Sequence, residues 1–178
     1  MINVLIVEDD PMVAELNKRY IQSVEGFSVM GIVSNGEDAL NFCKKNKVEL
    51  ILLDIYIPKI DGIHFLKELR RRCMMIDVIL VTASKESQNI DAALKLGATD
   101  YLIKPFEYER LKKSLESYLK QYKLLHSADT VKQEDLDKIR INFEMQGDNE
   151  LIKGLHKNTL ERIRTLMKDN GKEYLPVK

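Results

Sequence analysis

Carboxylates, a hydroxyl and an ammonium group stand directly after short apolar runs of the chain. Glu8-Asp9-Asp10 follows the first run and Asp54 follows the third, while Thr82 and Lys104 close the fourth and the fifth. Runs of this kind are typical of strands, and an open α/β sheet binds its ligands at the carboxyl ends of its strands. We therefore expect three of these acids, a hydroxyl and an ammonium group to meet at one place.

The chemistry expected of this set follows from its charges. Clustered carboxylates repel and raise one another's pKa unless a cation is bound, and oxygen ligands with room for water suit Mg²⁺. Such a site can attract a phosphoryl group: one carboxylate is the nucleophile, the metal and Lys104 neutralise phosphoryl oxygens, and the Thr82 hydroxyl bonds another. Lys104 would pair with Asp54 in the resting state. Each motif alone is more often a turn or a helix cap, so the prediction depends on their conjunction.

Five apolar runs rich in Val, Ile and Leu must position these groups. They span residues 3–7, 27–33, 50–53, 78–81 and 101–103, and most are continuous, as in strands that helices cover on both faces. Stretches with helical spacing separate them, and a last helix is expected near residues 107–124. The order predicts an α/β fold, a doubly wound parallel sheet of five strands.

Two helical stripes lead to more specific expectations. One apolar face of the first helix carries Val13, Leu16, Tyr20 and Val24. A heptad seam in the last helix steps through Leu111, Leu115, Tyr118, Tyr122 and Leu125. Its first part must pack on the sheet, and we expect its distal half, with Tyr118 and Tyr122, to form a homodimer contact. The alternative is a helix that packs entirely on its own sheet.

Four segments resemble the receiver domain of bacterial two-component response regulators. They are VLIVEDD (4–10), LLDIYIPKIDG (52–62), VTA (81–83) and GATDYLIKPF (97–106). The resemblance covers residues 1–124 and implies a flavodoxin-like (βα)₅ receiver fold. It also implies that Asp54 is the phosphoacceptor, and that Asp9, Asp10 and Asp54 bind Mg²⁺ together with the backbone carbonyl of Tyr56.

The same resemblance implies a switch. Thr82 and Lys104 would contact the phosphoryl group, and Tyr101 would be the aromatic switch residue. Phosphorylation adds nearly two negative charges at Asp54, so Thr82 would move towards them and Tyr101 would turn into the vacated space. This movement would change the family's usual signalling surface, formed by the fourth helix, the fifth strand and the fifth helix. The Lys104–Pro105 bond is expected to be cis.

Length and charge bound the other possibilities. The 178 residues carry 28 Lys+Arg and 28 Asp+Glu, which argues against binding nucleic acid or anionic membrane by bulk charge. Residues 1–150 hold 21 basic and 25 acidic residues, and residues 151–178 hold 7 and 3. No apolar run approaches the roughly 18 residues of a membrane helix, and no signal-peptide pattern is present. We expect a cytoplasmic location and no membrane partner. Cys43 and Cys73 fit no disulfide or metal pattern.

Beyond residue 124 the pattern changes. We expect a linker over residues 125–150 and, over residues 151–178, the incomplete start of a helical output domain. Residues 153–163 are similar to the segment that opens the helix-turn-helix domain in the citrate/malate-sensing subfamily of response regulators. A recognition helix would still be needed after Lys178, so DNA is an expected partner of the intact protein rather than of this chain. The alternative is a C-terminal helical extension with no role in DNA binding.

Together these features predict a response regulator that accepts a phosphoryl group on Asp54 from a sensor histidine kinase, requires Mg²⁺ and controls transcription. No enzymatic activity is expected beyond gaining and losing that phosphoryl group. The alternative is a stand-alone receiver module that acts through protein contacts alone. A phosphatase of the haloacid-dehalogenase type is excluded because Tyr56 replaces its second Asp. A dinucleotide enzyme is excluded because no GxGxxG follows the first strand.

Overall fold

A computed structural model describes residues 1–83 and 87–127 of the chain. Strands and helices alternate through it, as the apolar runs predict. The strands are β1 (Ile2–Val7), β2 (Phe27–Val33), β3 (Leu50–Asp54), β4 (Asp77–Thr82) and β5 (Asp100–Ile103). The helices are α1 (Pro11–Gln22), α2 (Gly36–Lys45), α3 (Gly62–Arg71), α4 (Ser87–Lys95) and α5 (Tyr108–Ser127). The predicted α/β fold is confirmed.

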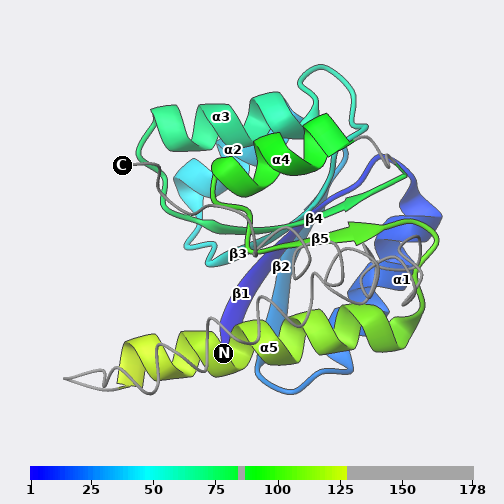
Figure 1. Ribbon diagram of the computed structural model, residues 1–178, viewed down its shortest axis with the longest axis vertical. Helices are drawn as coiled ribbons and strands as arrows, with labels where there is room; N and C mark the ends of the chain where they lie inside the picture. The colour runs from blue at the N-terminus through cyan, green and yellow to red at the C-terminus, as the bar shows by residue number, and fades with distance from the viewer. Residues whose placement is uncertain (84–86, 128–178) are drawn as a thin grey trace, which may run out of the picture. The chain divides into compact units, whose positions relative to one another are not determined.

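The five strands form one parallel sheet in the order β2-β1-β3-β4-β5. β1, β3 and β4 lie inside the sheet, and nearly all of their side chains are buried because helices cover both faces. Figure 1 shows α2, α3 and α4 on one face, with α1 and α5 on the other. The chain reverses its direction of travel across the sheet between β1 and β3, and at this point the strands' carboxyl ends form a crevice.

The ends of the helices follow their local chemistry. Asp10, Asn35 and Asp61 precede α1, α2 and α3, and each side chain accepts backbone N–H groups of the first helical turn. Gly97 follows α4 with φ at +77°, a left-handed conformation that glycine adopts without strain. The chain therefore leaves α4 through Gly97 before β5 begins at Asp100.

The face of α1 that packs on the sheet differs by one residue from the predicted stripe. Ala14, Asn17 and Ile21 are buried, whereas Leu16 is 45% exposed and Val13 is half-buried. Both stripes repeat at helical spacing, so the spacing alone does not determine which of them turns inward. In the folded protein the stripe with the smaller Ala14 and the buried Ile21 lies against the sheet.

The distal half of α5 packs on its own sheet at Tyr118 and Tyr122, as in the alternative to the predicted dimer contact, and that contact stays a prediction. Tyr118 is 4% exposed, and its hydroxyl donates to Asp77 Oδ2 at 2.9 Å. The half-buried Tyr122 donates its hydroxyl to Glu49 Oε1, also at 2.9 Å. Acids at the starts of β3 and β4 thus bind the tyrosine hydroxyls. A heptad pattern does not distinguish this internal packing from a contact between chains.

The chain divides into two compact units, Met1–Lys123 and Leu124–Lys178. Of the second unit the structure describes residues 124–127, the end of α5. The rest of the predicted linker and all of the predicted output helix lie outside the described residues. Within residues 1–83 and 87–127, no helix combines the length and the apolar character needed to cross a membrane.

Candidate functional site

Asp54 is the last residue of β3, and 6% of it is exposed. Its Oδ1 accepts a hydrogen bond from the Tyr56 N–H at 3.0 Å. The following loop folds back closely, since the Gly62 N–H donates to the Ile55 carbonyl at 2.8 Å. A Cβ atom on Gly62 would lie 2.7 Å from the Asp54 carbonyl oxygen. Glycine at this position therefore allows the loop to close against the end of the strand.

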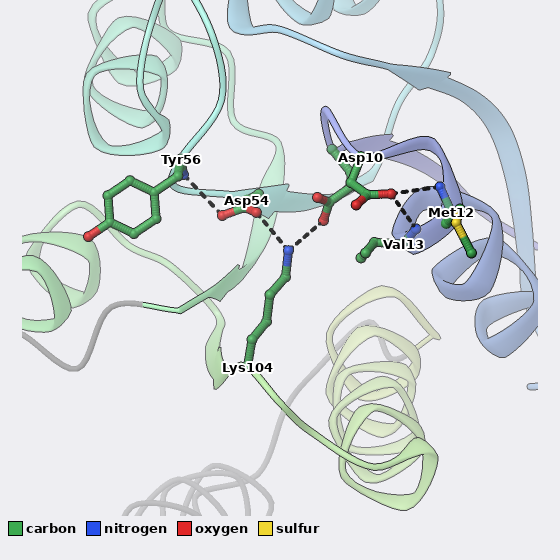
Figure 2. Close-up of polar contacts among 7 residues, drawn as sticks. Asp10, Met12, Val13, Asp54, Tyr56 and Lys104 are labelled. Atoms are coloured by element: carbon green, nitrogen blue, oxygen red, sulfur yellow. Dashed lines mark hydrogen bonds and ion pairs between the residues drawn. The ribbon is translucent and has the colours of Figure 1, made fainter.

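Lys104 follows β5 and bridges two buried carboxylates. Its Nζ lies 2.7 Å from Asp54 Oδ2 and 2.8 Å from Glu8 Oε2, and Figure 2 shows the contact with Asp54 as a dashed line from the ammonium group. The predicted resting pair between Lys104 and Asp54 is present. The second contact gives Glu8 a place in the site that the sequence analysis does not assign to it.

The carboxylates that come together are those of Glu8, Asp9 and Asp54. One oxygen from each lies within 4.8 Å of the other two. Glu8 is 4% exposed, whereas Asp9 is at the surface. Asp10 does not belong to this cluster, although the sequence analysis assigns it to the metal. Its Oδ1 accepts two N–H groups of the first turn of α1, at 2.8 and 3.2 Å (Figure 2).

The shift of one residue has a local cause. β1 ends at Val7, so Glu8 and Asp9 stand directly at the carboxyl end of the strand. Asp10 precedes Pro11, the first residue of α1, and so occupies the N-cap position, where an Asp side chain satisfies free N–H groups. The Asp-Pro step is therefore the sequence signal that separates the helix cap from the two acids before it.

The charges of the cluster are unevenly compensated. Burial raises the pKa of Glu8 above its usual value, and the hydrogen bond with Lys104 opposes that effect. Burial alone would lower the pKa of Lys104, but its hydrogen bonds to Asp54 and Glu8 outweigh burial and the pKa is raised. One ammonium group thus faces two buried acids, with the carboxylate of Asp9 beside them. A further cation would offset this excess of negative charge.

The donor set fits Mg²⁺. Its ligands would be hard carboxylate oxygens that already converge, and the exposed Asp9 leaves room for the waters that this ion usually retains. Two acids of the cluster, Glu8 and Asp9, also line a pocket of about 370 Å³. The lining residues are Glu8, Asp9, Pro11, Ala14, Ile32, Val33, Ser34 and Asp38.

Thr82 and Tyr101 belong to the same half of the sheet. Thr82 is the fully buried last residue of β4, and its neighbour Val81 is paired in register with Asp54. Tyr101 lies in β5 and is 9% exposed, packed into the apolar core on the side of α2, α3 and α4. Tyr101 is thus already buried in this structure. The Lys104–Pro105 bond is cis, as expected.

Comparison with known proteins gives the same picture. A family model described as the response regulator receiver domain matches residues 4–116. The "Probable C4-dicarboxylate response regulator DctR" of Bacillus subtilis (strain 168) is 42% identical over 166 residues, which are 93% of this chain and 73% of DctR. The "Transcriptional regulatory protein MalR" of the same organism is 44% identical over 164 residues, 92% of this chain and 70% of MalR.

A solved structure shares the fold. It is the complex of CheX and CheY with BeF3 and Mg²⁺ from Borrelia burgdorferi, with a TM-score of 0.61 and 27% identity over 66% of this chain and 89% of that one. The predicted likeness to the citrate/malate-sensing subfamily is confirmed by the relatives, which include the regulators DctR, MalR and CitT. The chain therefore belongs to the response regulators of two-component systems, and its receiver domain is homologous to those of transcription regulators.

Proposed function

We propose that Asp54 accepts a phosphoryl group from a phosphohistidine of a sensor histidine kinase. The observation that carries this proposal is the Lys104 bridge between Asp54 and Glu8, because it brings the Asp54 carboxylate, a cation and further acids together at one edge of the sheet. An Asp54 carboxylate oxygen attacks phosphorus, and a P–O bond forms as the P–N bond to histidine breaks. The imidazole leaves with a proton taken from water.

The residues that we assign to Mg²⁺ are Glu8, Asp9, Asp54 and the backbone carbonyl of Tyr56. When bound, the ion supplies positive charge that neutralises the phosphoryl oxygens. Two findings support this assignment: the three carboxylates converge within 4.8 Å, and the similar CheY complex contains Mg²⁺. Asp10 is left out of the assignment because its carboxylate caps α1.

Lys104 and Thr82 act on the transferred group. The ammonium group of Lys104 already lies at Asp54, so it is in place to balance the charge of the phosphoryl oxygens there. The Thr82 hydroxyl, one residue beyond the pair formed by Asp54 and Val81, would bond a phosphoryl oxygen. Phosphorylation would hold Thr82 towards Asp54 and keep Tyr101 buried beside it, and this state would change the surface of α4, β5 and α5.

The output that we propose is control of transcription by the cytoplasmic, intact regulator, through phosphorylation-dependent homodimers that bind DNA. The similarity to DctR and MalR supports this output, since it extends over 164–166 residues and therefore beyond the receiver match at residues 4–116. The name of DctR refers to C4-dicarboxylates. We infer that this chain serves a system that responds to such acids.

The test is phosphorylation by radiolabelled acetyl phosphate, a small phosphodonor, with Mg²⁺ or with EDTA. We expect one phosphoryl group per chain with Mg²⁺ and none with EDTA, and no labelling of Asp54→Asn. Glu8→Gln should need a higher Mg²⁺ concentration for half-maximal labelling. Labelling of Asp54→Asn at the parent rate would refute the assignment of the phosphoacceptor.

Asp10→Asn is the matched control. Asparagine also caps helices, so α1 should remain intact while one carboxylate of the acidic run is removed. We expect its Mg²⁺ requirement to equal that of the parent protein. A shift as large as that of Glu8→Gln would instead place Asp10 among the metal ligands.

A further inference from the structure

Side chains of this chain close the outer edge of β5. β5 is the last strand of the sheet, and among the described residues it pairs with β4 alone. The Lys104 N–H donates to the Thr82 carbonyl at 2.7 Å. Because backbone groups alternate in direction along a strand, the N–H and C=O groups of Tyr101 point away from β4. Edge groups that face away from the sheet are a template for another strand unless side chains bind them.

Asp100 and Arg110 bind both of these groups. Asp100 Oδ1 accepts the Tyr101 N–H at 2.7 Å, and Arg110 Nη2 donates to the Tyr101 carbonyl at 3.4 Å. The guanidinium group also makes two hydrogen bonds to the Asp100 carboxylate, at 3.0 and 3.1 Å. The side chains of Arg110 and Asp100 are 22% and 14% exposed, so water screens this ion pair less than an exposed one. A closed ring of hydrogen bonds thus surrounds the backbone of Tyr101.

We propose that Asp100 and Arg110 form a latch that positions Tyr101 in its buried orientation and thereby favours phosphorylation of Asp54. This inference rests on the proposed switch. A movement of the Tyr101 backbone outward from the core would have to break the ring of hydrogen bonds. If phosphorylation favours buried Tyr101, an interaction that holds Tyr101 buried favours phosphorylation by the same factor, because coupling between two equilibria is reciprocal.

The latch also joins Tyr101 to the helix that follows it. Arg110 lies in the first turn of α5, which begins at Tyr108. A planar guanidinium group can bind a carboxylate through two N–H groups and still donate to a carbonyl, which the single ammonium group of lysine does less well. β5 and the start of α5 therefore move together while the latch is closed.

Three variants test the latch. Arg110→Met removes the hydrogen-bond donors of Arg110. The swapped pair, Asp100→Arg with Arg110→Asp, restores an ion pair of opposite charges. It offers no acceptor to the Tyr101 N–H, however, and no donor to the Tyr101 carbonyl. Arg110→Lys replaces the swapped pair should the latter not fold. The matched control is Arg71→Met, because Arg71 on α3 makes two 2.7 Å hydrogen bonds to Glu68.

Two measurements are made on each variant. The first is the hydrogen exchange rate of the Tyr101 amide, measured by NMR. The second is the steady-state phosphorylated fraction with acetyl phosphate and Mg²⁺. We expect exchange about five-fold faster in Arg110→Met and in the swapped pair, as for the loss of one hydrogen bond. Both should have a lower phosphorylated fraction, and Arg71→Met should match the parent protein in both measurements.

The outcomes separate the latch from the proposed function. Unchanged exchange in Arg110→Met, or full recovery in the swapped pair, overturns the latch. Faster exchange with an unchanged phosphorylated fraction overturns its coupling to Asp54. If the parent protein is not phosphorylated at all, the proposed function fails, and the exchange rates still decide whether Asp100 and Arg110 hold Tyr101.

Discussion

Replacing Lys104 by methionine tests whether one ammonium group holds the acidic cluster together. Methionine retains much of the apolar stem of lysine but removes the charge that lies 2.7 Å from Asp54 and 2.8 Å from Glu8. The two carboxylates remain at sites where the parent residues are 6% and 4% exposed. We therefore expect Lys104→Met to lower the free energy of unfolding measured without a divalent metal.

The size of the loss follows from the geometry. Carboxylate oxygens of Glu8 and Asp54 lie within 4.8 Å of each other. Two such charges repel by about 3 kcal/mol at the effective dielectric constant of about 20 that suits protein sites. Removing one partner of a buried ion pair costs about 3–5 kcal/mol. Because the cluster opens to solvent at Asp9, we expect the lower figure, a loss of about 3 kcal/mol at neutral pH.

The assay is urea unfolding followed by circular dichroism, in EDTA and in Mg²⁺. Lys95→Met is the matched control: its ion pair with Asp91 has the same 2.7 Å distance, but the side chains are 75% and 62% exposed. That variant should lose less than about 1 kcal/mol. Adding Glu8→Gln to Lys104→Met should restore most of the loss, because it removes one of the two repelling charges. Mg²⁺ should stabilise Lys104→Met more than the parent protein, in which Lys104 already neutralises part of the cluster.

Two results would refute this reasoning. A loss in Lys104→Met no larger than in Lys95→Met would mean that the ion pairs at Asp54 and Glu8 contribute little to stability. If Lys104→Met loses about 3 kcal/mol and the added Glu8→Gln does not restore it, the Lys104 side chain stabilises the protein through packing rather than through charge.

Three further predictions follow from other parts of the molecule. Cys73 should react rapidly with a thiol reagent in the folded protein, because it is exposed. Cys43 should react only on unfolding, because burial raises the pKa of its thiol to about 11. Cys73→Ser should abolish the fast phase of the reaction. Partial burial would raise the pKa of Glu49, but hydrogen bonds to its carboxylate, including the one from Tyr122, lower that pKa. The ionised Glu49 carboxylate therefore stabilises the folded protein at a pH above its pKa in the unfolded chain. This stabilisation is lost as the pH falls through the pKa of Glu49 in the folded protein. Tyr122→Phe should reduce that loss in acid titrations of the unfolding midpoint, and an unchanged titration would contradict the role of this bond. Gly62→Ala should lower the free energy of unfolding by about 1–3 kcal/mol in the same urea assay, because the added methyl group would lie 2.7 Å from backbone atoms. An unaltered unfolding midpoint would show that the loop between Asp54 and Gly62 can move to accommodate this methyl group.

The five strands were predictable because the apolar runs are short, mostly continuous and followed by polar groups that belong at strand ends. Asp54 and Lys104 follow from this rule, since Asp54 ends β3 and Lys104 directly follows β5. The rule does not resolve the run Glu8-Asp9-Asp10, where the position of the helix start decides which acids face the site. The buried stripe of α1 presents the same ambiguity.

Contacts between residues far apart in the chain could not be predicted from the sequence for another reason. Tyr118 and Tyr122 have the spacing of a seam, and only the folded sheet places Asp77 and Glu49 beneath them. Asp100 and Arg110 are ten positions apart, and their pairing depends on how α5 leaves β5. Spacing predicts elements and strand ends, whereas partners across elements depend on packing.

The order of the strands has a consequence for how such a protein can diversify. The acids of the cluster stand at the carboxyl ends of β1 and β3 in the middle of the sheet, whereas Asp100, Tyr101 and the helix that follows them belong to its margin. Substitutions at that margin can therefore adapt the surface to a new recipient while the central strands and their acids stay unchanged. With Asp54 as the proposed phosphoacceptor, one acidic cluster can serve regulatory proteins with different recipients, which differ at residues away from Asp54.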